Sequence, residues 1–176
     1  MIVQIKNYRQ LVDYLKENKF TIATAESCTG GLIAKLITDV AGSSEVFIGG
    51  IVSYSNEMKK KWLAVKETTL FKFGAVSKQT VVEMLEGIHH ETGATFCIAV
   101  SGIAGPGGGT REKPVGTVFI GVRNDSQTVV EEFHFAGSRE NIRNSSAQKI
   151  IEMIQNLAFI KSSFSRKNGK TDQPQH

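Results

Sequence analysis

The chain has few of the residues that cross-link or interrupt a fold. Its 176 residues include two cysteines, three prolines and one tryptophan. Cys28 and Cys97 lie far apart and form no CxxC pair, which argues against a disulfide framework and a cysteine-based zinc site. No stretch approaches the ~18 consecutive apolar residues of a membrane helix, and the first ten residues contain no apolar run of signal-peptide length. We therefore expect a cytoplasmic protein with reduced thiols and no membrane association.

The net charge of +4 is concentrated near the C-terminus. Residues 161–176 contain four basic residues and one acidic residue, so the rest of the chain is close to neutral. Because a folded nucleic-acid-binding domain usually carries a basic stripe, we expect no stable binding of nucleic acid. The same segment has one large apolar side chain, which predicts a mobile basic tail after a single domain over residues 1–160.

The hydrophobic pattern alternates between helical and strand periods. Leu11, Val12 and Leu15 form the apolar stripe of a first helix, and Ser77 is a plausible N-cap for a later one that ends at Gly93. Helices are predicted over residues 6–18, from about 31, over 56–62 and 78–92, and from 138 to beyond Ala158; strands over 21–25, 46–54, 95–100, 115–122 and 128–135. This order predicts an α/β fold with three α/β/α layers, whose mixed, mostly parallel sheet is covered by helices on both faces.

Ser27 stands where the strand over residues 21–25 gives way to a helix, beside Gly30 and Gly31. Unpaired N–H groups at a helix N-terminus favour anions, so a serine there can be a nucleophile next to an oxyanion hole. The same position suits a helix N-cap, which is the commoner role for serine at such a place. Cys28 is a second candidate nucleophile, although a free cysteine is more often an inert core residue.

A nucleophilic hydroxyl needs a base, and no histidine lies in a glycine-rich turn of this sequence. A lysine whose pKa is lowered by burial is the alternative. Three consecutive lysines, Lys59 to Lys61, follow Tyr54 shortly after a predicted strand. Such a run most often forms a solvated helix face, and the residues alone leave open which lysine would be the base.

The segment 101–110 contains five glycines. It lacks the Lys-Ser/Thr pair of a P-loop, and it leads into a strand where a dinucleotide fingerprint would lead into a helix. A glycine-rich loop at the carboxyl end of a strand can hold a small anion with its amides, or it can be a simple connector. Thr29, Ser101 and Arg143 are candidate donors to a phosphate or carbonyl if the fold brings them together. No metal-binding motif is present, so no metal ion is expected.

Five motifs occur in order along the chain: Ala25-Glu-Ser-Cys-Thr-Gly-Gly31, Tyr54-Ser-Asn-Glu-Met-Lys59, Gly74-Ala-Val-Ser77, Val100-Ser-Gly-Ile-Ala-Gly-Pro106 and Lys113-Pro-Val-Gly-Thr117. Together they resemble the C-terminal domain of the competence/damage-inducible protein CinA, over about residues 6–160. The enzymatically active members of that family are nicotinamide-nucleotide amidohydrolases. The resemblance implies hydrolysis of nicotinamide mononucleotide to nicotinate mononucleotide and ammonia, a step of pyridine nucleotide salvage that uses no cofactor.

The resemblance also implies roles for individual residues. Ser27 would be the nucleophile, Lys59 its base, and Tyr54 the hydroxyl that orients or relays the proton. Among the three lysines, Lys59 alone matches the family's Tyr-Ser-Asn-x-x-Lys spacing. The implied substrate-binding residues are Thr29, Gly30, Gly31, Asn56, Ser101, Gly102, Gly105 and Arg143, with the amides of the first three suited to an oxyanion or phosphate.

Two other functions remain open at this point. The chain could be a nucleotide-binding or adaptor module with the same fold and no turnover, or an amidohydrolase of another small amide. In each case we expect a small-molecule ligand, and we expect the chain to form a homo-oligomer.

Overall fold

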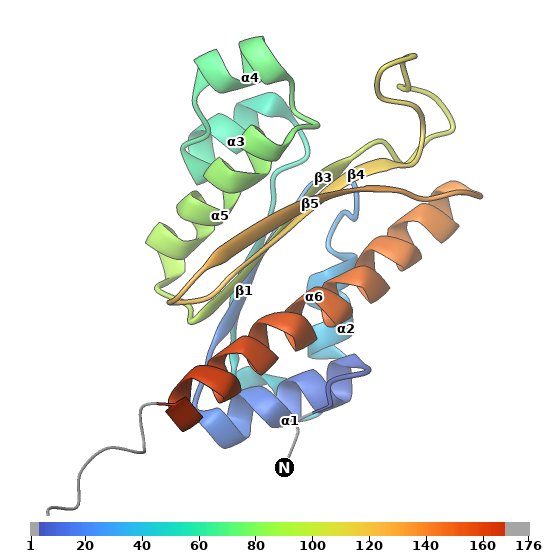
Figure 1. The fold of residues 1–176 in the computed structure, drawn as a ribbon. Coiled ribbons are helices and arrows are strands. Elements are labelled where there is room, and N and C mark those ends of the chain that lie inside the picture. Colours follow the sequence, from blue (N-terminus) through green and yellow to red (C-terminus); the bar gives the residue numbers. More distant parts are fainter. Residues whose placement is uncertain (1–3, 168–176) are drawn as a thin grey trace, which may run out of the picture.

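A computed structural model describes residues 4–167 of the chain (Figure 1). The helices are α1 (Tyr8–Asn18), α2 (Leu32–Thr38), α3 (Asn56–Leu63), α4 (Glu67–Phe73), α5 (Lys78–Thr92) and α6 (Arg139–Lys167), with a 3-10 turn, η1 (Ser43–Glu45). The strands are β1 (Ile22–Glu26), β2 (Phe47–Val52), β3 (Phe96–Gly102), β4 (Thr117–Arg123) and β5 (Thr128–His134). No helix in this part of the chain is long and apolar enough to cross a membrane.

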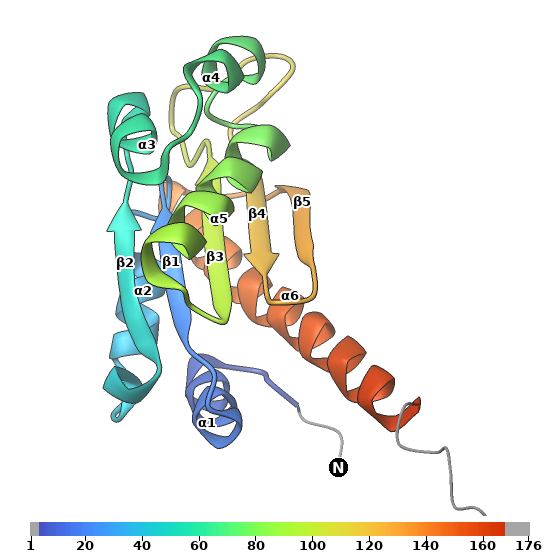
Figure 2. The same ribbon diagram turned by 90° about the vertical axis from the view of Figure 1, so that its left-hand side faces the viewer.

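The five strands form one mixed sheet in the order β2-β1-β3-β4-β5. β1 pairs in parallel with β2 and β3, whereas β4 pairs antiparallel with β3 and β5. Parallel and antiparallel pairings are thus equally frequent, because β4 and β5 are joined by a short hairpin while the earlier strands are joined through helices. The predicted three-layer α/β class with a mixed sheet is confirmed (Figure 2).

Helices cover both faces of the sheet and create two hydrophobic cores. α1, α2 and α6 lie on one face, and α5 with α3 lies on the other (Figures 1 and 2). β1 contributes to both cores because its side chains alternate: Ile22 belongs to the first, Ala23 and Ala25 to the second. The small alanines on the second face leave room for α5 to approach the sheet closely.

Most predicted elements match the observed ones within a few residues, but α4 was not predicted. The helix is only seven residues long; Leu70 packs, partly buried, against the second core, but Phe71 is 93% exposed, so α4 has no extended apolar stripe. At the other end, α6 continues to Lys167, past the point where the tail was expected to begin. Residues 168–176 and the burial expected for Ala158 lie outside what the structure describes.

Gly87 marks the closest approach of α5 to α3. A Cβ at this position would lie 2.2 Å from the carbonyl oxygen of Leu63, a backbone atom at the end of α3. Such a contact cannot be relieved by moving a flexible side chain, so a larger residue would push the two helices apart. Because α3 also carries Lys59, this contact determines how closely the helix that carries that lysine packs on α5.

Gly87→Ala is therefore expected to destabilise the protein, although alanine is intrinsically the better helix former. We expect the free energy of unfolding to fall by about 1–3 kcal/mol, the usual cost of overpacking a core. Gly49→Ala is the control, since nothing lies within 4 Å of a Cβ there. Urea denaturation would measure both variants, and a Gly87→Ala protein as stable as the wild type would contradict the packing described.

Candidate active site

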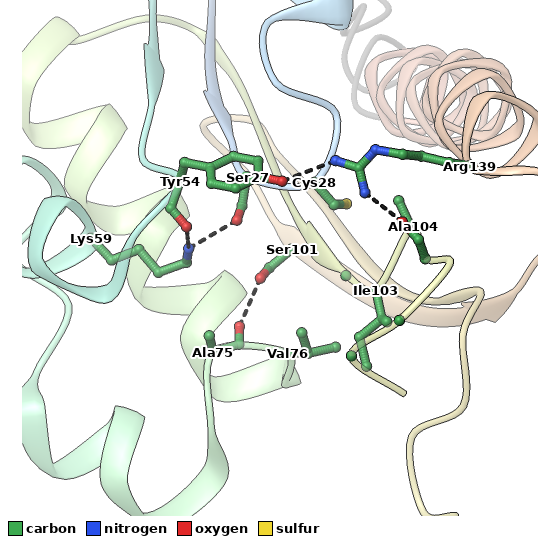
Figure 3. Close-up of a pocket in the computed structure, with 14 residues that line it drawn as sticks. Ser27, Cys28, Tyr54, Lys59, Ala75, Val76, Ser101, Ile103, Ala104 and Arg139 are labelled. Atoms are coloured by element: carbon green, nitrogen blue, oxygen red, sulfur yellow. Dashed lines mark hydrogen bonds between the residues drawn. The ribbon is translucent and has the colours of Figure 1, made fainter. Parts of the chain in front are cut away.

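A pocket of about 270 Å³ lies where β1 and β3 end and the turns after them diverge. This volume is near the lower end of the range for small-ligand sites, about 300–1,000 Å³. The described residues that line it are Ser27, Cys28, Tyr54, Lys59, Ala75, Val76, Ser101, Gly102, Ile103, Ala104, Gly105, Gly107, Gly108 and Arg139 (Figure 3). The ends of neighbouring parallel strands are a common place for ligands in α/β folds.

Ser27 and Lys59 are in direct contact at the bottom of this pocket. Ser27 immediately follows β1, and its backbone N–H donates to the carbonyl oxygen of Val100 on β3 at 3.0 Å. Lys59 reaches from α3, and its Nζ lies 2.9 Å from Ser27 Oγ (Figure 3). Ser27 and Lys59 are 32 positions apart in the sequence, and they are brought together because β2 lies beside β1 and leads directly into α3. A nucleophile and a base within hydrogen-bond distance are the geometry required for general-base activation.

The amine of Lys59 is almost completely withdrawn from water. The residue is 1% exposed, and Nζ also donates to the backbone carbonyl of Ser53 at 2.8 Å. Burial disfavours the charged form and lowers the lysine pKa from 10.5 to about 8. None of the ion pairs within residues 4–167 includes Lys59. The neutral amine is therefore accessible near physiological pH, as a base requires.

The N-terminus of α2 is occupied by a carboxylate of the protein. Glu26 is fully buried, and its two oxygens accept hydrogen bonds from the backbone N–H groups of Gly31, Ile33 and Ala34, at 2.9–3.2 Å. The Gly30 N–H donates to the carbonyl of Ser27. The amides of Gly30 and Gly31, expected to face an oxyanion or phosphate, thus have protein partners. Glu26 satisfies the helix end and fixes the turn that carries Ser27.

Tyr54 lies at the mouth of the pocket and is 60% exposed. Its hydroxyl accepts a hydrogen bond from Nη2 of Arg139 at 2.9 Å, while Nη1 of the same arginine donates to the carbonyl of Gly105 at 2.7 Å. Arg139, at the start of α6, therefore connects the Tyr54 side of the pocket with the glycine-rich loop (Figure 3). Together with Lys59 it makes the lining basic, and the described lining contains no acidic side chain.

The structure brings some of the predicted binding residues to the pocket and places others elsewhere. Ser101, Gly102 and Gly105 line it, and the Ser101 hydroxyl donates to the carbonyl of Ala75 at 2.7 Å. The residues outside its lining are Thr29, Gly30, Gly31, Asn56 and Arg143.

Arg143 and Asn56 have other surroundings in the structure. Arg143 donates through Nε and Nη2 to the carbonyl of Thr29, so it stabilises the turn that follows Ser27. Asn56 is an exposed residue in the first turn of α3. Neither residue is among those that line the pocket.

Cys28 lines the pocket beside Ser27, but its thiol is a poor nucleophile there. The side chain is buried, and burial raises its pKa to about 11, with the charge of Glu26 acting in the same direction. Because the thiolate is the reactive form, a raised pKa disfavours attack by this residue. Ser27, with the amine at 2.9 Å, is the better candidate.

Sequence reasoning missed two residues of the site, Glu26 and Arg139. A carboxylate just before a glycine-containing turn and a helix is a recognisable signal for a buried helix cap. Arg139 and Arg143 are one helical turn apart, and no pattern in the sequence distinguishes which of them faces the pocket. Within the described residues, no group of three His, Cys, Asp or Glu side chains is arranged to hold a metal ion.

Comparison with known proteins shows which family the chain resembles. Residues 5–158 match the model of the CinA C-terminal domain. The chain is 54% identical over 144 residues to a CinA-like protein of Thermotoga neapolitana, covering 82% of this chain and 35% of that protein. It is 51% identical over 140 residues to a putative competence-damage inducible protein of Acetivibrio thermocellus, covering 80% and 34%. The chain thus spans about a third of the length of these relatives.

Solved structures show the same fold. The competence/damage inducible protein CihA of Agrobacterium tumefaciens superposes with a TM-score of 0.84 at 40% identity, covering 86% of this chain and 93% of that one. The competence damage-inducible protein A (ComA) of Klebsiella pneumoniae gives a TM-score of 0.81 at 34% identity, covering 85% and 96%. With a family match over nearly all described residues and relatives above half identity, the chain belongs to the CinA C-terminal domain family.

Proposed function

We propose that the chain hydrolyses the carboxamide of nicotinamide mononucleotide, giving nicotinate mononucleotide and ammonia. The observation that carries the proposal is the buried Lys59 amine, 2.9 Å from the Ser27 hydroxyl and without an acidic partner among the described residues. A hydroxyl paired with a neutral amine is the nucleophile–base arrangement of Ser-Lys hydrolases. The substrate follows from the family resemblance described above, and the basic pocket is compatible with a phosphorylated ligand.

The surroundings of Lys59 support a role as the base in the first step. A neutral amine has two N–H groups and one lone pair. The carbonyl oxygens of Ser53 and Tyr54 lie 2.8 and 3.5 Å from Nζ and can accept the two N–H groups. The lone pair is then left to accept the proton of the Ser27 hydroxyl as Oγ attacks the amide carbon.

The remaining steps conserve atoms and charge. The lysine returns the proton to the amide nitrogen, the C–N bond breaks, and ammonia leaves an acyl ester on Ser27. A water molecule then attacks the ester carbonyl and gives its proton to Lys59. Lys59 passes this proton to Ser27 Oγ as the ester bond breaks, and the nicotinic acid product loses its own proton to solvent and is released as the carboxylate.

Arg139 supports recognition of an anionic ligand at the pocket mouth. Its guanidinium is held in place by the Tyr54 hydroxyl and the Gly105 carbonyl, so it is presented with little loss of side-chain freedom. Guanidinium groups are well suited to the planar, charged oxygens of phosphates. In this arrangement the Tyr54 hydroxyl orients Arg139. Among the hydrogen bonds of the described residues it contacts neither Ser27 Oγ nor Lys59 Nζ, so the proton-relay role that the family resemblance implies has no counterpart in this geometry.

Ser27→Ala is expected to reduce ammonia release from nicotinamide mononucleotide by at least about 10³-fold, because the nucleophile is removed. Cys28→Ala is the matched control from the same turn, and it should retain most of the wild-type rate. Coupled-enzyme detection of ammonia, without added metal, would compare the two variants with the wild type. A Cys28→Ala protein as inactive as Ser27→Ala would contradict the serine mechanism, and a silent but folded wild type would contradict the proposed substrate.

Lys59→Met should lower kcat by about 10²–10⁴-fold, the usual contribution of a general base. Methionine fills a similar volume and needs no hydrogen-bond partner, so the fold is expected to survive. Lys61→Met provides the control, since Lys61 is exposed on the same helix. Equal activity of the two variants would remove Lys59 from the mechanism.

The pH dependence follows from the lowered pKa of Lys59. Only the neutral amine can accept the serine proton, so kcat/KM should rise with pH as the amine loses its proton. Half of the maximal value is expected near pH 8, where the pKa of Lys59 lies. Rate measurements between pH 6 and 10 would reveal this single ionisation, and a profile that is flat or falls over this range would be incompatible with a lysine base.

A further inference from the structure

The turn between α4 and α5, residues 74–76, forms one wall of the pocket through Ala75 and Val76. The carbonyl groups on and just before this turn accept hydrogen bonds from side chains, some at the start of α5 and some on distant segments. Ser77 and Thr80 donate to Gly74 at 2.9 and 2.8 Å, and Ser101 donates to Ala75. The turn lies outside the helices and the sheet, so these side chains determine where the wall stands.

Lys113 donates two further hydrogen bonds to backbone carbonyls at the two ends of this turn. Its Nζ donates to the carbonyl of Phe73 at 2.9 Å and to that of Val76 at 2.7 Å. Phe73 is the last residue of α4, where carbonyls lack a helical partner and a cation is favoured. Gly74 follows with φ 77° and ψ 169°, a backbone conformation available almost only to glycine, and a Cβ there would lie 3.8 Å from the lysine Nζ.

Lys113 is not itself a lining residue, but it belongs to the loop that forms another wall of the same pocket. It lies in the loop between β3 and β4, whose residues Gly105, Gly107 and Gly108 line the pocket. The Lys113 backbone is fixed within this loop, because its N–H bonds to Thr110 Oγ1 and its carbonyl accepts from the Thr110 N–H. One side chain therefore joins two walls that are about 40 residues apart in sequence.

Arg139 holds the same loop from the other side, through the carbonyl of Gly105. The loop is thus attached to α6 at one point and to the α4–α5 turn at another. Its glycines offer little resistance to movement by themselves. The width of the space between them and Val76 depends on these cation–carbonyl contacts.

We propose that Lys113 is a positioning residue: by holding the glycine-rich loop against the α4–α5 turn, it sets the pocket in the shape that binds substrate. Lys113 holds the two walls in place. Among the hydrogen bonds of the described residues, none joins Lys113 to Ser27 or Lys59. Its loss therefore weakens ligand binding and leaves the chemical step nearly unchanged. The consequence for turnover rests on the proposed function; the consequence for the two walls does not.

Lys113→Met removes the cation and keeps an unbranched side chain only one atom shorter. We expect KM for nicotinamide mononucleotide to rise about tenfold, equivalent to ~1.4 kcal/mol, with kcat within about twofold of the wild type. Lys113→Arg, which can still donate to both carbonyls, should recover a large part of the affinity. Lys72→Met is the control: it removes an exposed cation on α4 whose contact is with the ring of Phe73.

Amide hydrogen exchange without substrate tests, independently of catalysis, whether Lys113 holds the glycine-rich loop against the α4–α5 turn. In Lys113→Met, exchange should accelerate in residues 74–77 and 103–109, and remain at the wild-type rate in α5 and β1. If the wild type releases no ammonia, the proposed function fails, and calorimetry of nicotinamide mononucleotide binding replaces KM. Unchanged exchange in both segments, or a loss of kcat at unchanged KM, would overturn the role assigned to Lys113.

Discussion

The burial of the Lys59 amine is the constraint on which the rest of the site depends. An ammonium group withdrawn from water loses solvation, so its pKa falls to about 8 and the neutral form becomes available. This requires α3 to pack closely on α5, and the absence of a side chain at Gly87 permits that approach. It also requires β2 to lead straight into α3, so that the carbonyl of Ser53 can hold the amine beside Ser27. Packing in the second core and the chemistry of the pocket are therefore linked.

The walls of the pocket are held mainly by side chains that donate to backbone carbonyls. Arg139 fixes the loop at Gly105, Lys113 joins that loop to Phe73 and Val76, and Ser101 holds Ala75. Bonds from cations are stronger than those between neutral groups, and each one restrains a segment that has no regular structure of its own. The protein thereby combines glycine-rich backbone, which leaves room for a ligand, with a defined position for that backbone. Glu26 likewise fixes the position of the turn that carries Ser27, here by accepting hydrogen bonds from the backbone N–H groups at the N-terminus of α2.

Much of the fold could be predicted because its elements have local causes. The apolar stripe of α1 and the capping serine of α5 are present in a few neighbouring residues, and both elements were found where expected. α4 was not predicted because it is short and one of its two phenylalanines, Phe71, is exposed to water. In the site, Ser27 and Lys59 could be named through family motifs. Glu26 carried a local signal that was not used, whereas the choice between Arg139 and Arg143 had none, because both stand on the same helix.

The sequence by itself determined the alternation of helices and strands, the strand–turn–helix around Ser27 and the glycine-rich segment after β3, since each follows from residues that are neighbours in the chain. Only the tertiary structure decided which lysine is buried, which arginine faces the pocket and which backbone amides already have partners. Those facts depend on how α3 and α6 dock on the sheet. Docking is set by the combined packing of many residues, such as the α5 side chains against Gly121 and the Leu63 backbone of α3 against Gly87, and no single stretch of sequence contains that information.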